Sequence, residues 1–290
     1  MTLQSSAARR HGAVTVAITS GKGGVGKTSL AVNLAAALRA MGQRIGILDA
    51  DFGLGSVDVM LGLAPAAHLG AVLNGECAMG DVVVDGPAGI RIVAAGSGIR
   101  ALTTLGAPQW DRLVDGLREL GASLDFLLVD TSPGIGDHVI DVVRLADRVI
   151  VVTGNEPTSL VDAYAMVKLL LSASAHREIG IVVNAAQDAD EGQRVFRQLE
   201  SATRRFLGRP IRYYGCIERD PAVSEAVFSQ TPLVMDRPDA AASRAYRRLA
   251  LRVVNWPSRG PAVDLADRRS ASAPAPLPAM SAGTGVSRCA

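Results

Sequence analysis

The sequence is poor in cysteine, in aromatic residues and in net charge. Its three cysteines, Cys77, Cys216 and Cys289, form no Cys-x-x-Cys pair, which argues against a disulfide framework, a zinc site or an iron–sulfur site. A formal net charge of +2 gives no argument for binding nucleic acid or an acidic membrane surface. Aromatic residues make up 4% of the chain and hydrophobic residues 48%, so we expect a core of aliphatic side chains.

Long apolar segments are also lacking. No apolar run is long enough to span a membrane, and residues 1–11 are not followed by the apolar stretch of a signal peptide, so we expect a cytoplasmic protein. From Pro257 onward the chain consists mainly of Ser, Ala, Pro, Gly and Arg, a composition that buries too little apolar surface to fold. The expected organisation is a flexible N-terminus at 1–12, one domain at 13–256 and a disordered tail at 257–290.

A glycine-rich motif between an expected strand and an expected helix is typical of a loop that binds nucleotide phosphates. It reads Ser-Gly-Lys-Gly-Gly-Val-Gly-Lys-Thr over 20–28. Glycines let consecutive backbone N–H groups face an anion, and the helix adds the positive end of its dipole. Lys27 is expected to reach the β- and γ-phosphates of ATP, and Thr28 to coordinate Mg²⁺. The residues expected to bind ATP here are Gly21, Lys22, Gly23, Gly24, Val25, Gly26, Lys27, Thr28 and Ser29.

Strand-like and helix-like segments alternate along the whole expected domain; among them, apolar spacing predicts a helix at 109–120, and the last strand is expected at 211–214. The strand runs at 126–129, 148–153 and 179–183 are nearly continuous in apolar residues, which is typical of strands buried on both faces. The alternation predicts an α/β fold with a doubly wound, mostly parallel sheet, as in P-loop NTPases. Such folds bind ligands at the carboxyl ends of their strands, where the sequence places Asp51, Asp130 and Asn184.

The two aspartates are candidates for holding the metal and orienting the nucleophile of phosphoryl transfer. Hydrolysis of ATP needs a held phosphate, a metal ion and an oriented water molecule. Asp130 follows four apolar residues, as a Walker B aspartate does, and is expected to bind the Mg²⁺ shell, with Thr28 and Asp51 as further metal candidates. Gly134 is placed to offer its N–H to the γ-phosphate as part of a switch loop. Helix capping is the competing explanation for an aspartate at a strand end.

The lysine near the start of the loop adds a more specific resemblance. With Lys22 in place, the motif Lys-Gly-Gly-Val-Gly-Lys-Thr resembles the deviant P-loop of the MinD/ParA family of ATPases. The resemblance implies an ATP-dependent homodimer in which Lys22 crosses the interface to the partner's phosphates and acts in catalysis with Lys27, although a solvated loop lysine also fits. It implies that residues 49–58 form the first switch, in which Asp51 orients the attacking water and Asp49 is structural or lies near the metal. It also implies that the Asn184 amide recognises adenine, with a turn-forming asparagine as the alternative.

Further segments resemble the FlhG/FleN/YlxH branch of this family, whose members control flagellar number and placement. The likeness covers roughly residues 14–254. It implies a switch with slow, partner-stimulated ATP hydrolysis, and as partners a flagellar GTPase, a transcription regulator or basal-body proteins. The segments that carry it are 49–63, 73–76, 92–98, 214–215, 220–223 and 230–232.

Departures from the branch leave alternatives open. Pro133 stands in the second switch where a small residue is usual, and because proline has no N–H, the chain could be a regulator that binds ATP with little hydrolysis. The N-terminal element that activates the flagellar GTPase is not clear at 4–10. A terminal membrane helix is not evident either. The amphipathic stretch at 246–254 is expected to pack on the sheet, which leaves only weak, peripheral binding at the inner face of the plasma membrane.

A ParA-type partition ATPase bound to DNA is the other alternative. Such a protein needs a basic surface or an added DNA-binding domain, and the sequence offers neither clearly, so we do not expect nucleic acid as a partner. Arginines near 204–205 and 244–252 keep this alternative open.

Overall fold

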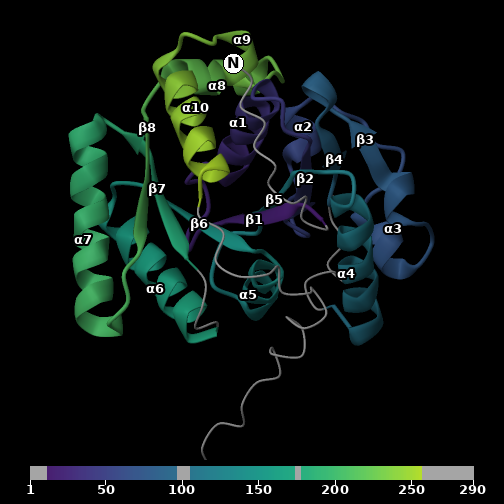
Figure 1. Cartoon of the computed structure of the whole chain (residues 1–290), viewed down its shortest axis with the longest axis horizontal. Helices are drawn as coiled ribbons and strands as arrows, with labels where there is room; N and C mark the ends of the chain where they lie inside the picture. The colour runs from purple at the N-terminus through teal and green to yellow at the C-terminus, as the bar shows by residue number, and fades with distance from the viewer. Residues whose placement is uncertain (1–11, 97–104, 174–177, 257–290) are drawn as a thin grey trace, which may run out of the picture.

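One eight-stranded sheet forms the centre of the protein. The computed structural model describes residues 12–96, 105–173 and 178–256; the predictions for residues 1–11, for 97–98 and for the tail from 257, with Cys289, lie outside them. The strand order is β3-β4-β2-β5-β1-β6-β7-β8, with helices on both faces (Figure 1). Neighbouring strands are parallel except for β3 and β4. The predicted doubly wound, mostly parallel α/β fold is confirmed.

The central strands are buried because helices cover both of their faces. Every residue of β2, β5 and β6 is buried, which explains their continuous apolar sequences. The antiparallel edge strand β3 was not predicted, because its three residues are too short to show a period. The bounds are β1 Val14–Thr19, β2 Ile45–Ala50, β3 Val83–Asp85, β4 Arg91–Val93, β5 Phe126–Thr131, β6 Arg148–Thr153, β7 Ile179–Ala186 and β8 Arg212–Glu218.

The helices form two layers, one on each side of the sheet. Helices α1 and α8 to α10 lie on one side, and α4 to α7 lie on the other (Figure 1). The bounds are α1 Lys27–Ala40, α2 Val57–Met60, α3 Leu69–Asn74, α4 Ala107–Gly121, α5 Asp137–Arg144, α6 Pro157–Ala173, α7 Ala189–Leu207, α8 Pro221–Phe228, α9 Leu233–Asp236 and α10 Ala241–Val254, with short 3-10 helices η1 Met79–Val82 and η2 Pro87–Gly89.

Alternate residues of each strand supply the two cores. In β6, Ile150 and Val152 pack in the cluster that contains α1 and α10, whereas Val149 and Val151 pack in the cluster of α5 to α7. Successive side chains of a strand point to opposite faces of the sheet, so one apolar strand contributes to the cores on both sides.

The last helix, α10, packs on the sheet as the sequence predicted. Tyr246, Leu249 and Val253 are at most 2% exposed within the cluster that also holds α1. The buried Arg148 of β6 donates hydrogen bonds to the carbonyl oxygens of Val253 and Trp256 at 2.8 and 2.9 Å, so it satisfies the C-terminal end of the helix. Across the described residues, we find no helix with the length and apolarity needed to cross a membrane.

Candidate nucleotide-binding site

The glycine-rich loop leaves β1 and turns directly into α1. Gly24 and Gly26 have φ angles of 76° and 89°, a left-handed conformation that favours glycine. Gly26 forms the N-cap of α1, and a Cβ atom added there would lie 2.3 Å from the Asn184 Nδ2 atom. This loop therefore has the backbone geometry that aims N–H groups at an anion beside a helix N-terminus.

Lys27 begins α1 and points into the protein. Lys27 is only 8% exposed. Burial lowers the pKa of its ammonium group, whereas the negative charges of Asp130 and Asp51 raise it. A buried ammonium beside two carboxylates is suited to contact a bound phosphate. Binding of the β- and γ-phosphates by Lys27 stays a prediction.

Asp130, near the end of β5, has a buried carboxylate oxygen without a hydrogen-bond partner among the described residues. Burial, followed by the charge of Asp49, raises the pKa of Asp130 to about 7; the Thr28 hydroxyl and the Lys27 ammonium oppose the rise. An unsatisfied buried oxygen costs free energy unless a cation or a donor approaches it. Asp130 and Thr28 therefore fit the predicted magnesium site, in which Mg²⁺ takes few protein ligands and completes its shell with water and phosphate oxygens.

Asp49 holds the first switch segment in place through hydrogen bonds to its backbone. Its carboxylate accepts hydrogen bonds from the backbone N–H groups of Asp51, Ser56 and Val57 at 2.9 to 3.1 Å. Burial raises the pKa of Asp49 to about 6, while these three bonds oppose the rise. Asp49 therefore fixes the loop that carries Asp51.

Asp51 lies just beyond β2 and connects the two predicted switch segments. The Ser132 hydroxyl donates a hydrogen bond to Asp51 Oδ1 at 2.9 Å. In the second switch, the Gly134 N–H donates to the Ser20 carbonyl oxygen at 3.0 Å. The Gly134 N–H is therefore engaged by the phosphate-binding loop, and contact with a γ-phosphate would require this hydrogen bond to break.

Asn184 lies two residues before the end of β7 and contacts the phosphate-binding loop. Its Nδ2 atom donates to the Val25 carbonyl oxygen at 2.8 Å. The amide thus supports the loop from the neighbouring strand, a role that sequence spacing could not reveal because the residues are 159 positions apart. Recognition of adenine by Asn184 stays a prediction.

Lys22 does not point towards Lys27 but lies at the outer side of the loop. Its Nζ atom is 2.6 Å from Glu156 Oε2 and 3.3 Å from Thr158 Oγ1, at the start of α6. The Lys22 side chain is 40% exposed, and its ammonium lowers the pKa of Glu156. Glu156 was not predicted as a site residue, and only the fold brings it to the loop.

The sequence-predicted residues thus meet at one edge of the sheet, where β1, β2, β5 and β7 end. A model of the ParA family, described as "NUBPL iron-transfer P-loop NTPase", matches residues 13–254. The chain belongs to the MinD/ParA family of P-loop ATPases. Among the described residues no group of three or more His, Cys, Asp or Glu side chains is placed to hold a metal ion by itself.

Relatives place the chain in the FlhG/FleN/YlxH branch of the MinD/ParA family. It is 42% identical over 247 residues to the antiactivator FleN of Pseudomonas aeruginosa, a match that covers 85% of this chain and 88% of FleN. It is 30% identical to the flagellum site-determining protein YlxH of Helicobacter pylori over 81% of this chain and 80% of YlxH. The structure of the septum site-determining protein MinD with Mg-ADP from Pyrococcus horikoshii superimposes with a TM-score of 0.70 and 22% identity, covering 82% of this chain and 95% of that one, which shows the shared fold.

Proposed function

We propose that this chain is an ATP-dependent dimeric switch that regulates flagellar number and placement, or flagellar gene expression, through protein partners. The observation that carries the proposal is the arrangement at the strand ends. Lys27, Asp130 and Asp51 converge on the phosphate-binding loop, while Lys22 lies exposed beside it. A lysine at the outer side of the loop is free to approach a second nucleotide only after its ion pair with Glu156 opens.

Each residue has a separate task in this proposal. Bound Mg²⁺ would neutralise charge on the phosphate oxygens. Thr28 and Asp130 would hold the metal, Lys27 would bind the phosphates, and Asp51 would orient the attacking water. The hydrogen bond from Ser132 to Asp51 links both switches, so a change at one is passed to the other.

The flagellar role rests on the relationship to FleN and YlxH, which this chain matches over most of the length of each. We propose a flagellar GTPase, a transcription regulator or basal-body proteins as partners, in the cytoplasm or at the inner face of the plasma membrane. FleN is named an antiactivator, which favours a regulator of gene expression among these partners.

Replacing Asp51 tests the switch. Asp51→Ala should lower ATP hydrolysis by roughly 100-fold, because it removes the group that positions water. The variant should then accumulate as a dimer with ATP in size-exclusion chromatography with light scattering. Asp58→Ala, which removes a half-buried carboxylate on the nearby α2, is the matched control and should behave as wild type. An Asp51→Ala variant that stays monomeric with ATP would contradict the dimeric switch.

A regulator that binds ATP with little hydrolysis is a second candidate, favoured by one observation. Pro133 has no N–H and precedes Gly134, whose own N–H is bonded to the Ser20 carbonyl. For this candidate, Pro133→Ala should raise the steady-state ATPase rate above wild type. An unchanged rate would show that Pro133 does not limit hydrolysis. Salt-dependent binding of DNA with ATP would instead favour the partition ATPase.

A further inference from the structure

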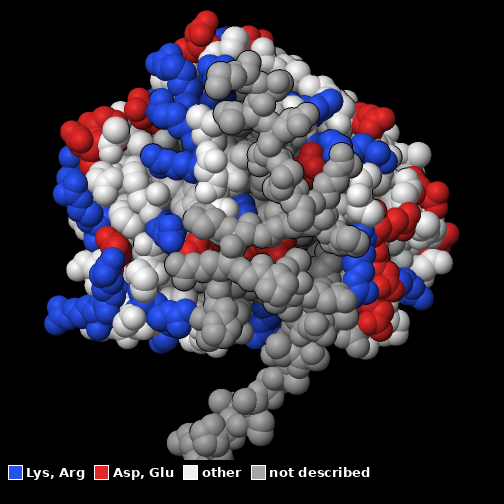
Figure 2. Space-filling view, in the orientation of Figure 1, with Lys and Arg blue, Asp and Glu red and all other residues white. Residues whose placement is uncertain are grey.

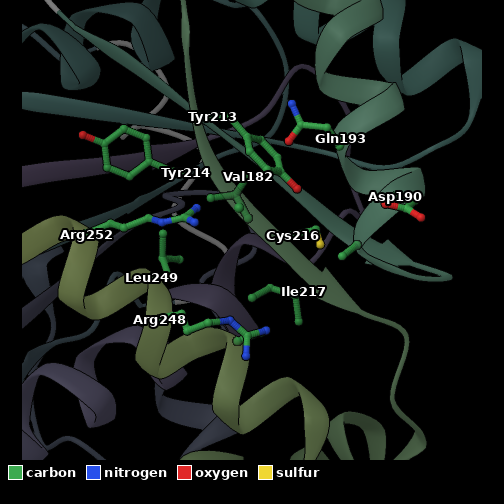
Figure 3. Close-up of a pocket in the computed structure, with 13 residues that line it drawn as sticks. Val182, Asp190, Gln193, Tyr213, Tyr214, Cys216, Ile217, Arg248, Leu249 and Arg252 are labelled. Atoms are coloured by element: carbon green, nitrogen blue, oxygen red, sulfur yellow. The ribbon is translucent and has the colours of Figure 1, made fainter.

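A pocket of about 290 Å³ lies at the last strand of the sheet, β8, next to β7, whose Asn184 pairs with the pocket residue Ile217. It is formed by α7, β8 and α10, and β8 is separated from β1 by β6 and β7. Figure 3 shows Asp190 and Gln193 of α7 on one side of β8 and Arg248 and Arg252 of α10 on the other. The mechanism proposed above uses none of these residues.

The outer edge of β8 lies along this pocket without a neighbouring strand. Among the described residues β8 pairs only with β7, and the register shifts by one residue between Tyr213 and Gly215. From Gly215 to Ile217 the pairing with β7 is in constant register again, so a short stretch of edge follows the bulge. An open edge offers backbone donors and acceptors to an extended segment, and the bulge limits the length that can pair.

Two arginines stand over this edge. Arg248 and Arg252 are one helical turn apart, and neither forms an ion pair or a hydrogen bond with a residue in the described ranges. Gly215, with φ of 123°, brings the strand close to Arg252, because an added Cβ would lie 2.9 Å from its Nη1 atom. Like charges at this spacing repel each other, so an anion shared between them would be stabilising.

Figure 2 shows Lys and Arg side chains gathered over α7, β8 and α10, at the left of the view. The floor between these helices is apolar, with Val182, Ile217 and Leu249 at most 2% exposed. A basic rim around an apolar floor fits an extended chain that carries both acidic and apolar side chains.

Other ligands fit this pocket less well. A nucleobase would need an aromatic face, but Tyr213 packs on Phe196 and Tyr214 on Trp256 at centroid distances of 5.0 and 4.1 Å. A nucleic-acid backbone would need continuous positive charge, whereas Asp190 lines the same pocket.

We propose that the edge of β8 between α7 and α10 binds a short, acidic, extended segment of a partner protein as an added strand. The backbone of 215–217 pairs with the segment, Arg248 and Arg252 bind its carboxylates, and an apolar side chain enters the pocket. The inference concerns a surface apart from the nucleotide site and stands whether or not ATP controls dimerisation.

A synthetic peptide tests this directly. The probe is a fluorescein-labelled decapeptide of alternating Glu and Val, and its binding to the full chain is measured by fluorescence anisotropy with and without ATP. The peptide should bind, and Arg248→Ala with Arg252→Ala should weaken binding roughly tenfold or more. Arg197→Ala with Arg205→Ala removes the same charge from exposed positions of α7 outside the pocket and should leave binding unchanged.

Two further binding experiments distinguish strand addition from nonspecific electrostatic attraction. An alternating Glu and Pro decapeptide should not bind, because proline cannot donate to the sheet edge. Arg248→Glu with Arg252→Glu should transfer binding to an alternating Lys and Val decapeptide. The proposal is overturned if the Glu and Pro peptide binds as tightly as the Glu and Val peptide, or if both double alanine variants lose equal affinity for the Glu and Val peptide. It is also overturned if replacing Arg248 and Arg252 weakens binding of a DNA duplex or of phosphatidylglycerol vesicles but not of the peptide.

Discussion

Asp49 and Asp130 are two carboxylates that the fold keeps away from water next to each other. Burial is the largest cause of the raised pKa of each, about 6 for Asp49 and about 7 for Asp130, and each carboxylate lies near another acidic group. Their ionised forms are therefore disfavoured until a cation arrives. A bound metal ion would reduce the electrostatic repulsion between these two carboxylates.

Removing the charge of Asp130 should make this repulsion measurable in the nucleotide-free protein. Because the folded-state pKa of about 7 lies above the ordinary 3.8, folding takes up a proton between these values, and the free energy of unfolding falls as pH rises from about 4 to 7. Asp130→Asn should remove most of this slope and stabilise the protein at pH 8 by on the order of 2 kcal/mol.

Urea unfolding at pH 5 and pH 8 provides the measurement for Asp130→Asn. Asp147→Asn would not serve as a control, because Asp147 accepts the Thr15 N–H at the start of the sheet; the exposed Asp239→Asn, just before α10, is the better match. The same Asp130→Asn variant should lose the stabilisation that Mg-ATP gives to wild type. If the free energy of unfolding of Asp130→Asn depends on pH as it does in wild type, the protonation of Asp130 is not the cause of that pH dependence.

At the scale of elements, the carboxyl-terminal end of α10 is locked to the sheet by one cluster. Arg148 lies 5.4 Å from the centroid of the Trp256 ring and donates to the carbonyl oxygens that end the helix. Trp256 also donates to Glu178 Oε2 at 2.7 Å and packs on Tyr214. The amphipathic pattern of this helix is thus used for the core and not left for a membrane.

Truncating Trp256 should therefore undo the docking of α10. Trp256→Ala leaves a cavity and removes the contacts with Arg148 and Tyr214, so the free energy of unfolding should fall by about 3 kcal/mol. Leu251→Ala, on the exposed face of the same helix, should change it by less than about 1 kcal/mol. Chemical denaturation measures both. Equal effects for the two variants would contradict the docking of α10 through Trp256.

The boundaries of a helix could be predicted from local sequence where its apolar periodicity extended over several turns. The spacing of Trp110, Leu113, Leu117 and Leu120 predicted a helix over 109–120, and α4 spans Ala107–Gly121. The strand predicted at 211–214 instead runs over Arg212–Glu218, because pairing with β7 carries it past the bulge at Tyr214. Pairing of this kind depends on the neighbouring strand and leaves no period in the sequence.

For the whole molecule, Lys22 is the residue that we propose joins one chain to a second. In the single chain it is paired with Glu156, an exposed ion pair whose contribution to stability is about 0–1 kcal/mol. Such a pair is weak enough to exchange for contact with a phosphate of a partner subunit. We therefore expect the residue to act in assembly and not in nucleotide binding by the single chain.

Replacing Lys22 in the Asp51→Ala background should separate these two steps. Lys22→Gln should keep the affinity for fluorescent ATP within about twofold, because its ammonium contacts Glu156 and Thr158 and not the interior of the loop. The variant should fail to dimerise with ATP in size-exclusion chromatography with light scattering. Glu156→Gln removes the same ion pair, keeps the lysine and should still dimerise. Dimerisation by Lys22→Gln at the wild-type ATP concentration would refute this role.

The phosphate-binding loop, the α/β class and the strand-end residues could be predicted from the sequence, because they depend on spacing within one segment and on the buried character of each strand. The contacts that hold them could not be predicted: Asn184 with Val25, Ser132 with Asp51 and Glu156 with Lys22 join positions 81 to 159 residues apart. These contacts follow from the order of the strands in the sheet. That order is set by the packing of the whole chain, which no local pattern contains.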